Sequence, residues 1–310
     1  SINFAVGDIS LSGGTLSNFV GSGTTYTARF KPSSDGATTI DVNSSSFTDL
    51  AGNNNSAASQ FNWTYDSTSP SITISSSTVS SGSSSNDTTI AVAFTTSETT
   101  SNFTAEDVNI DGGSISSFSG SGKSYTATLT PNGDGIINID VNAGAFTDAS
   151  GNLNTAATQF TWTYDSTSPT MTITAAEVSD GDTSNDGSLT LTFTSSEATA
   201  NFAVGDITVS GGTLNDSNGV STFAATSTTV YTATFTPSAD GACTIDVGAG
   251  GFADGVGNTN TAATQFNWTT TSFSPTMTIT SSTVSDGDTS NDNSIALTFT
   301  SKEDTSNSAV

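Results

Sequence analysis

Carboxylates are the side chains of this chain with the clearest capacity for chemistry. The sequence has 29 acidic residues, four basic residues and no histidine, which gives a formal net charge of −25. This balance excludes nucleic acids and anionic membrane surfaces as partners, because both require a cationic surface. It favours cation binding. Solubility in salty surroundings, where self-repulsion is screened, is the alternative.

The residue types argue against an enzyme. Without histidine, the chain has no Ser/His/Asp or Cys/His arrangement. A carboxylate pair suffices for glycoside hydrolysis, but the acidic residues recur at equivalent positions, and three identical active sites in one stalk would be unusual. Cys243 is the single cysteine, and its alternation with Ile245 and Val247 predicts a buried apolar position rather than a reactive thiol. We therefore predict no catalytic residues and no cofactor-binding residues other than metal ligands.

The sequence repeats itself about every hundred residues. The segment 65–70 (YDSTSP) recurs as 164–169 and, in degraded form, as 270–275 (TTSFSP). Tryptophans keep step with it, at separations of 99 and 106 residues: Trp63, Trp162 and Trp268. The longer separation reflects an insertion at 215–230. Val310 has the same phase as Val6, so we hypothesise a periodic fibre in which one copy continues into the next.

Strand signals follow one another at short intervals within each repeat. Ile137, Ile139 and Val141 alternate with polar residues, which is typical of a half-buried strand. Turn residues such as those of 131–135 (PNGDG) separate the runs, and no segment has a useful helical pattern. The strands predicted for the second repeat are 71–75, 88–95, 107–110, 114–118, 124–130, 136–141 and 159–164.

This spacing predicts an all-β fold of tandem seven-stranded immunoglobulin-like β-sandwiches in an elongated array. Residues 70–168 and 169–274 are predicted to be complete repeats, the latter with the insertion at 215–230. Residues 1–69 are predicted to be the C-terminal part of a repeat, and 275–310 the N-terminal strands of a further one. The tryptophans lie in phase with Phe and Tyr on one strand face, which favours core packing over sugar stacking.

Several motifs in fixed order resemble a known family. They are 201–207 (NFAVGDI), 211–214 (GGTL), 231–233 (YTA), 240–241 (DG), 254–258 (DGVGN) and the Ser-Pro linker. Over essentially the whole chain, the sequence resembles bacterial immunoglobulin-like tandem repeats of large surface adhesins and biofilm-associated proteins. The resemblance implies a secreted chain of β-sandwiches, often stiffened by calcium, without implying one ligand.

Calcium prefers six to eight oxygen ligands. In an immunoglobulin-like topology, alternate loops lie at the same pole, so acidic residues from several loops should meet at the junctions between repeats. The first junction is predicted to gather Asp35, Asp66, Glu98 and Asp148. The second is predicted to gather Asp87, Asp134, Asp165, Glu197 and Asp254. A third, weaker site is left with Asp186, Asp240 and Glu303, because Thr271 holds its linker position.

Each acidic residue also has a local interpretation. Asp35-Gly36 and Asp134-Gly135 suit tight turns in which Asp bonds its own backbone. The segment 148–152 (DASGN) suits a loop in which the Asp side chain bonds the loop's own backbone. Asp87 suits the end of a loop before a strand. Local hydrogen bonding within turns and calcium binding between domains therefore both remain possible roles for these residues.

The predicted function is that of a structural or adhesive segment of an extracellular or cell-surface filament or adhesin, acting as a spacer or self-assembling fibre. Its expected partners are copies of itself or adjacent repeats. The alternative is a recognition module that binds a glycan or a neighbouring cell through polar loops, with 215–230 as the leading loop. No apolar run is long enough to span a membrane, so no membrane insertion is expected in this segment.

Overall fold

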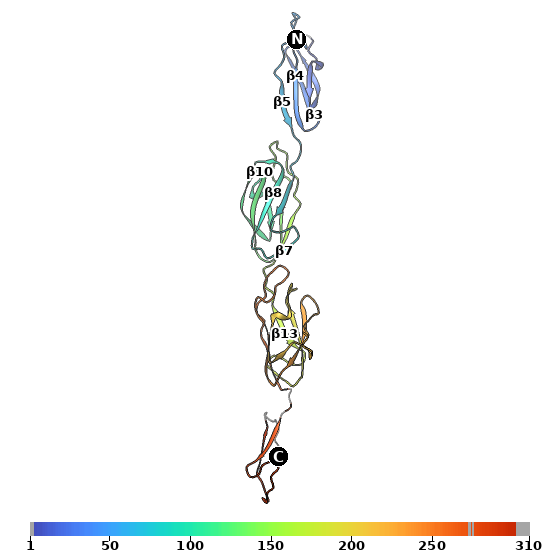
Figure 1. Cartoon of the computed structure of the whole chain (residues 1–310). Helices are drawn as coiled ribbons and strands as arrows, with labels where there is room; N and C mark the ends of the chain where they lie inside the picture. Colours follow the sequence, from blue (N-terminus) through green and yellow to red (C-terminus); the bar gives the residue numbers. More distant parts are fainter. Residues whose placement is uncertain (1–2, 272–273, 275, 302–310) are drawn as a thin grey trace. The chain divides into compact units, whose positions relative to one another are not determined.

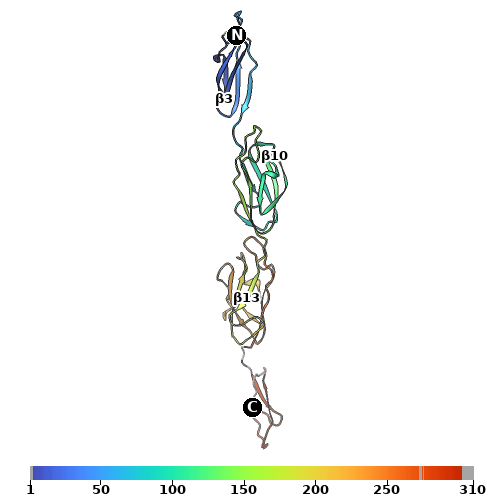
Figure 2. The ribbon, with the colours of Figure 1, turned by 180° about the vertical axis from the view of Figure 1, so that it is seen from behind.

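The computed structural model describes residues 3–271, 274 and 276–301. Within these residues the chain is built from β-strands, and its helical segments are 3-10 turns of three residues. Figures 1 and 2 show this strand architecture from two sides. The described part of the chain holds no helix with the length and apolarity that a membrane crossing needs. The chain divides into two compact units, Ser1–Asp165 and Ser166–Val310.

The second repeat, in the first unit, is a complete two-sheet sandwich. Its elements are β6 (Ile72–Ser76), β7 (Ser84–Ser85), β8 (Ile90–Thr100), η2 (Ala105–Asp107), β9 (Val108–Asp111), β10 (Gly113–Pro131), β11 (Gly135–Val141) and β12 (Phe160–Tyr164). One sheet has the order β10-β8-β6, and the other has the order β7-β12-β11-β9. The predicted all-β immunoglobulin-like fold is therefore confirmed.

The core of this repeat follows the predicted alternation. Ile137, Ile139 and Val141 on β11 are at most 1 % exposed, whereas the residues between them are half-buried. Trp162 on β12 is fully buried, and its indole N–H donates to the Ser85 hydroxyl at 3.1 Å. The tryptophan stripe is thus core in this repeat, as predicted.

Two strand predictions need correction. The predicted strands 114–118 and 124–130 form one continuous run, β10, which folds back on itself: the Ser116 hydroxyl donates to the Thr128 carbonyl at 3.5 Å. The two-residue strand β7 was not predicted. It exists through its parallel pairing with β12, a contact that its own short polar sequence does not encode.

A glycine lies where the chain passes from one sheet to the other. Gly112, between β9 and β10, has φ +81°, and a Cβ there would lie 2.8 Å from the Ile136 carbonyl oxygen. Gly13 and Gly211 also have positive φ angles, and a Cβ at either position would lie similarly close to a carbonyl oxygen. A side chain at these positions would be strained and would clash, so each repeat uses Gly at this point.

The third repeat, in the second unit, has the same design. Its elements are β13 (Met171–Ala175), β14 (Thr183–Ser184), β15 (Leu189–Ser195), η3 (Val204–Asp206), β16 (Ile207–Ser210), β17 (Gly212–Thr213), β18 (Ala224–Ala225), β19 (Val230–Pro237), β20 (Gly241–Val247) and β21 (Phe266–Thr270). Its sheets are β13-β15-β19-β17, with β18 also on β19, and β14-β21-β20-β16. Cys243 is fully buried in this core and is a free thiol, as predicted.

The insertion at 215–230 packs against this sandwich and leaves its two sheets intact. It contributes β18 to β19, and Phe223 stacks on Tyr231 with ring centroids 5.6 Å apart. Phe118 and Tyr125 make the same stack in the second repeat, at 5.8 Å. The insertion therefore keeps the aromatic contact that the shorter hairpin makes.

The first repeat and the C-terminal strands are less complete. The first contains η1 (Val6–Asp8), β1 (Ile9–Ser12), β2 (Gly14–Ser22), β3 (Thr25–Pro32), β4 (Gly36–Val42) and β5 (Phe61–Tyr65), in the sheets β1-β4-β5 and β2-β3. The antiparallel pair β22 (Met277–Ser281) and β23 (Leu297–Ser301) lies at the red end of the colour bar in Figure 1.

Candidate metal centre

Asp66 follows β5 directly and begins the linker to the second repeat. Its carboxylate accepts a hydrogen bond from the Ser150 hydroxyl at 2.9 Å, and its backbone carbonyl accepts one from the Asn152 amide at 3.2 Å. Ser150 and Asn152 belong to a loop of the second repeat. The linker is therefore bonded to the sandwich that follows it.

Asp148 begins that loop and shapes it. One carboxylate oxygen accepts the backbone N–H groups of Ser150 and Asn152 at 2.8 and 2.9 Å, and the other accepts the Asn152 side-chain amide at 2.9 Å. Desolvation opposes ionisation, but these hydrogen bonds outweigh it and lower the pKa of Asp148. The hydrogen bonds thus favour the ionised form of the carboxylate, although the residue is buried.

Glu98 approaches from the end of β8. Thr96, two residues earlier on this strand, donates its hydroxyl to the Glu98 carbonyl at 2.6 Å. Desolvation, followed by repulsion from Asp66 and Asp148, raises the pKa of Glu98. A carboxylate whose ionisation is disfavoured by neighbouring carboxylates gains most from a cation placed among them.

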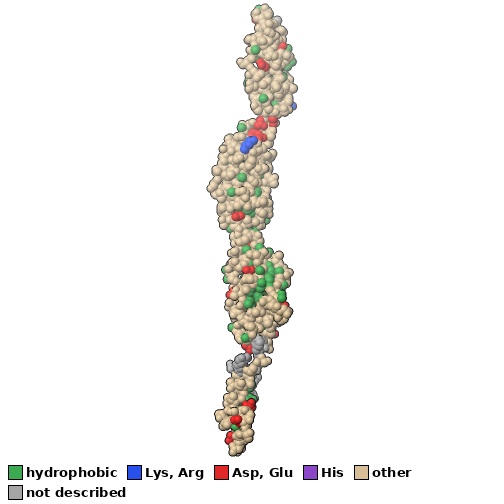
Figure 3. Space-filling model, in the orientation of Figure 1, with side chains coloured by type: hydrophobic (Ala, Val, Ile, Leu, Met, Phe, Trp, Pro, Cys, Tyr) green, Lys and Arg blue, Asp and Glu red, His purple; other side chains and the backbone are tan. Residues whose placement is uncertain are grey.

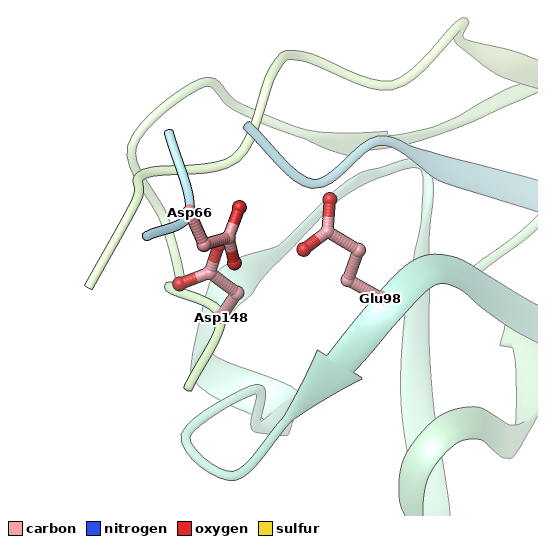
Figure 4. Close-up of side chains that lie close together, drawn as sticks. All are labelled: Asp66, Glu98 and Asp148. Carbon is pink, nitrogen blue, oxygen red and sulfur yellow. The ribbon is translucent and has the colours of Figure 1, made fainter. Parts of the chain in front are cut away.

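The three carboxylates come together within the first unit, as Figure 4 shows. Asp66, Glu98 and Asp148 each offer one oxygen, and these oxygens all lie within 4.8 Å of one another. Calcium binds oxygen at about 2.3–2.6 Å, so two ligands of one ion lie at most about 5.2 Å apart. The separation and the hard-oxygen chemistry of the donors therefore both fit calcium.

Lys123 lies close enough to this cluster to influence it. Its ammonium donates to the Ser97 carbonyl at 2.6 Å, and its charge partly offsets the raised pKa of Glu98. In Figure 3, acidic side chains gather next to a basic group on this unit. No role was predicted for Lys123 from the sequence, although it is one of only four basic residues.

Asp35 lies near the three carboxylates, because its charge is among the causes that raise the pKa of Glu98. Its carboxylate accepts hydrogen bonds from the Ser67 backbone and hydroxyl, at 2.9 and 2.7 Å, and from the Thr68 hydroxyl at 2.5 Å. The Thr68 and Ser67 hydroxyls lower the pKa of Asp35. Asp35 therefore binds the linker residues that follow Asp66, and its role as a metal ligand stays a prediction. The turn interpretation, in which Asp35 bonds its own backbone, differs from these contacts.

The remaining predicted ligands fall into three places. Asp87, Asp134 and Asp165 belong to the first unit, where the backbone N–H groups of Asp87 and Asp165 both donate to Ser85. Glu197, Asp254, Asp186 and Asp240 belong to the second unit. Glu303 lies outside the described residues. Metal binding at these positions stays a prediction.

Turn chemistry and metal ligation are compatible at the loop aspartates. Asp49, Asp148 and Asp254 each begin a loop in which one oxygen accepts backbone N–H groups and the other accepts an Asn amide. Each carboxylate oxygen has two lone pairs, so one hydrogen bond leaves capacity for a cation. The loop interpretation is therefore correct for Asp148 without excluding the metal.

The tandem β-sandwiches place this protein in the immunoglobulin-like class. Residues 1–65, 66–164 and 165–271 each match the family model described as a bacterial Ig-like domain. Because these matches cover most of the sequence, the chain belongs to the family of bacterial Ig-like domains.

Solved structures with detectable likeness include bacterial adhesins. The Escherichia coli adhesin FdeC is 18 % identical over 84 % of this chain and 84 % of its own, with a TM-score of 0.38. Invasin, a bacterial integrin-binding protein, is 13 % identical over 77 % of this chain and 48 % of its own, with a TM-score of 0.34. The D00–D0 domains of intimin are 15 % identical over 64 % and 98 %, with a TM-score of 0.30. A search of curated protein sequences found no match.

Proposed function

We propose that this chain is a non-catalytic structural segment of a secreted or cell-surface adhesin or filament, in which the repeats act as a calcium-stiffened spacer. The observation that carries this proposal is the bonding of the linker. Asp66 is tied to the loop of the next repeat, and its carboxylate joins Glu98 and Asp148 from that repeat. A linker fixed in this way transmits force and direction between neighbouring sandwiches, which a spacer requires.

Calcium is the cation that this donor set fits. Asp66, Glu98 and Asp148 supply one oxygen each, and water and backbone carbonyls supply the others that calcium needs. The ion would neutralise the three carboxylates and hold the linker against the loop and against the end of β8. By sequence equivalence we extend the proposal to Asp165, Glu197 and Asp254. There Thr229 stands in place of Lys123, so we expect stronger dependence on calcium.

A distance measurement between the first two repeats tests the spacer. Spin labels are placed on Thr15→Cys and Thr126→Cys, which are exposed on β2 and β10, and labelled protein is diluted with unlabelled protein. Cys243 is buried and stays unlabelled. We expect calcium to narrow the distance distribution and chelator to broaden it. An added Asp66→Asn substitution should keep it broad in both conditions.

A distribution that is equally wide with calcium and with chelator would remove calcium from the proposal. A broad distribution that Asp66→Asn leaves unchanged in both conditions would remove the stiffened linker as well. The matched control is Asp41→Asn, whose carboxylate lies on β4 away from the linker; we expect it to behave as the unsubstituted protein does.

A further inference from the structure

Lys123 is a basic side chain beside the three carboxylates of the candidate metal centre. The chain has only four basic residues against 29 acidic ones, and the charge of this one acts on Glu98. The equivalent positions of the first and third repeats hold Thr24 and Thr229. The lysine therefore distinguishes this junction from the common design of the repeats.

An irregularity in the ladder between β8 and β10 positions this lysine. Thr95 on β8 lies opposite Ser124 on β10, and the next pair is Thr100 with Gly122. The four residues between the two threonines therefore face Lys123 alone. A bulge of this kind bends the strand and changes the direction of its side chains. It sets the end of β8, with its glutamate, opposite the lysine.

The ammonium group of Lys123 is held against the backbone of this bulge. It donates to the Ser97 carbonyl at 2.6 Å, one residue before Glu98. A hydrogen bond from a charged donor is stronger than one from a neutral donor. The side chain is exposed, so a cation is fixed close to Glu98 without being buried. Its charge favours the ionised form of Glu98, which desolvation and the neighbouring carboxylates disfavour.

A fixed ammonium group has two opposite effects on the site. Without calcium, its attraction for the three carboxylates offsets part of the repulsion among them. With calcium, it repels the ion, because both groups are cations. The same side chain therefore stabilises the calcium-free junction and weakens the binding of calcium.

We propose that Lys123 is a built-in counter-ion of this site, which keeps the linker partly ordered without calcium and raises the calcium concentration at which the site fills. A junction with threonine at this position has no such substitute for the ion. This role rests on the proposed calcium-stiffened spacer, whose response to calcium it sets.

A calcium titration of the spin-labelled 310-residue polypeptide tests this role. Labels on Thr15→Cys and Thr126→Cys report on the first junction alone, and the calcium concentration that gives half of the narrowing is its midpoint. We expect Lys123→Thr, which introduces the residue of the other repeats, to lower this midpoint roughly tenfold. In chelator, the same substitution should broaden the distance distribution. Lys123→Arg keeps the charge and should restore both values.

Two controls separate the charge of the lysine from other effects. Arg29→Thr removes one positive charge from the exposed face of β3, and it should leave the midpoint within about twofold because that charge does not act on Glu98. Sodium chloride at about 1 M should reduce the difference between Lys123→Thr and the unsubstituted protein, because salt screens exposed charges. A difference due to packing alone would persist in salt.

The possible failures of the two proposals are distinct. If calcium narrows the distribution with the same midpoint in Lys123→Thr and in the unsubstituted protein, the spacer stands and the counter-ion role is overturned. A midpoint of Lys123→Arg that equals that of Lys123→Thr would also overturn it. If calcium changes the distribution in none of these proteins, the calcium site itself fails, and the role of Lys123 fails with it.

Discussion

At the scale of single residues, Glu98 is a carboxylate whose surroundings disfavour its ionisation. Its pKa is raised in the folded protein by desolvation and by Asp66 and Asp148. For an acid with a raised folded pKa, ionisation above that pKa destabilises the fold, and the penalty disappears as the pH falls below it. A cation among the three carboxylates would remove the same penalty at neutral pH.

We therefore expect Glu98→Gln to raise the melting temperature in chelator at pH 7 and to reduce the gain that calcium gives. Scanning calorimetry with calcium and with chelator measures both effects. Glu106→Gln, an exposed acid on η2, is the matched control and should change neither. A melting temperature that Glu98→Gln lowers in chelator would contradict this electrostatic interpretation.

Asp35 should show the opposite dependence on pH. Hydrogen bonds from Thr68 and Ser67 lower its folded pKa from the usual 3.8. The stabilisation is present above about pH 3.8 and is lost as the pH falls through the lowered folded value. In acid titration of thermal stability, the unsubstituted protein should lose more than Asp35→Asn over that window. Parallel curves for the two proteins would contradict the linker contact.

At the scale of elements, burial decides the effect of a substitution at equivalent positions. We expect Phe160→Ala to cost about 3–5 kcal/mol of unfolding free energy, because Phe160 is 3 % exposed in a complete core. Phe61→Ala, at 65 % exposure, should cost under about 1 kcal/mol. Urea unfolding of the two variants measures the difference. Equal losses would show that the first repeat has a closed core.

The insertion at 215–230 should be dispensable for folding. Replacing it with the shorter segment 116–124 retains an aromatic residue, Phe118, in place of Phe223, so the stack on Tyr231 is kept. We expect the third repeat to melt within a few degrees of the original. Unchanged adhesion after this replacement would favour the spacer, and lost adhesion would favour recognition through this loop.

Much of the element structure could be predicted from sequence because period-two alternation reports which face of a strand is buried. Ile137, Ile139 and Val141 are the clearest case. Strand β7 could not be predicted, since it is defined by its partner β12 rather than by its own residues. The grouping of Asp66, Glu98 and Asp148 followed from loop topology. The binding of Asp35 to Ser67 and Thr68 did not, because it depends on the path of the linker.

At the scale of the whole molecule, we expect each repeat to be an independent mechanical unit joined to the next by a stiffened linker. Each complete repeat has a core cluster of its own, one built around Trp162 and the other around Trp268. A domain with its own core unfolds as its own cooperative unit. Calcium at the linker should raise the force needed to unfold the second repeat, because the ion would join the linker to a loop and a strand end of that repeat.

Single-molecule stretching of the 310-residue polypeptide tests this claim most directly. We expect separate unfolding events, each releasing roughly 330–360 Å of contour length for a repeat of about a hundred residues. We also expect chelator to lower the force at which at least the second repeat unfolds. A single event for the whole chain, or extension without resistance in the presence of calcium, would contradict the account.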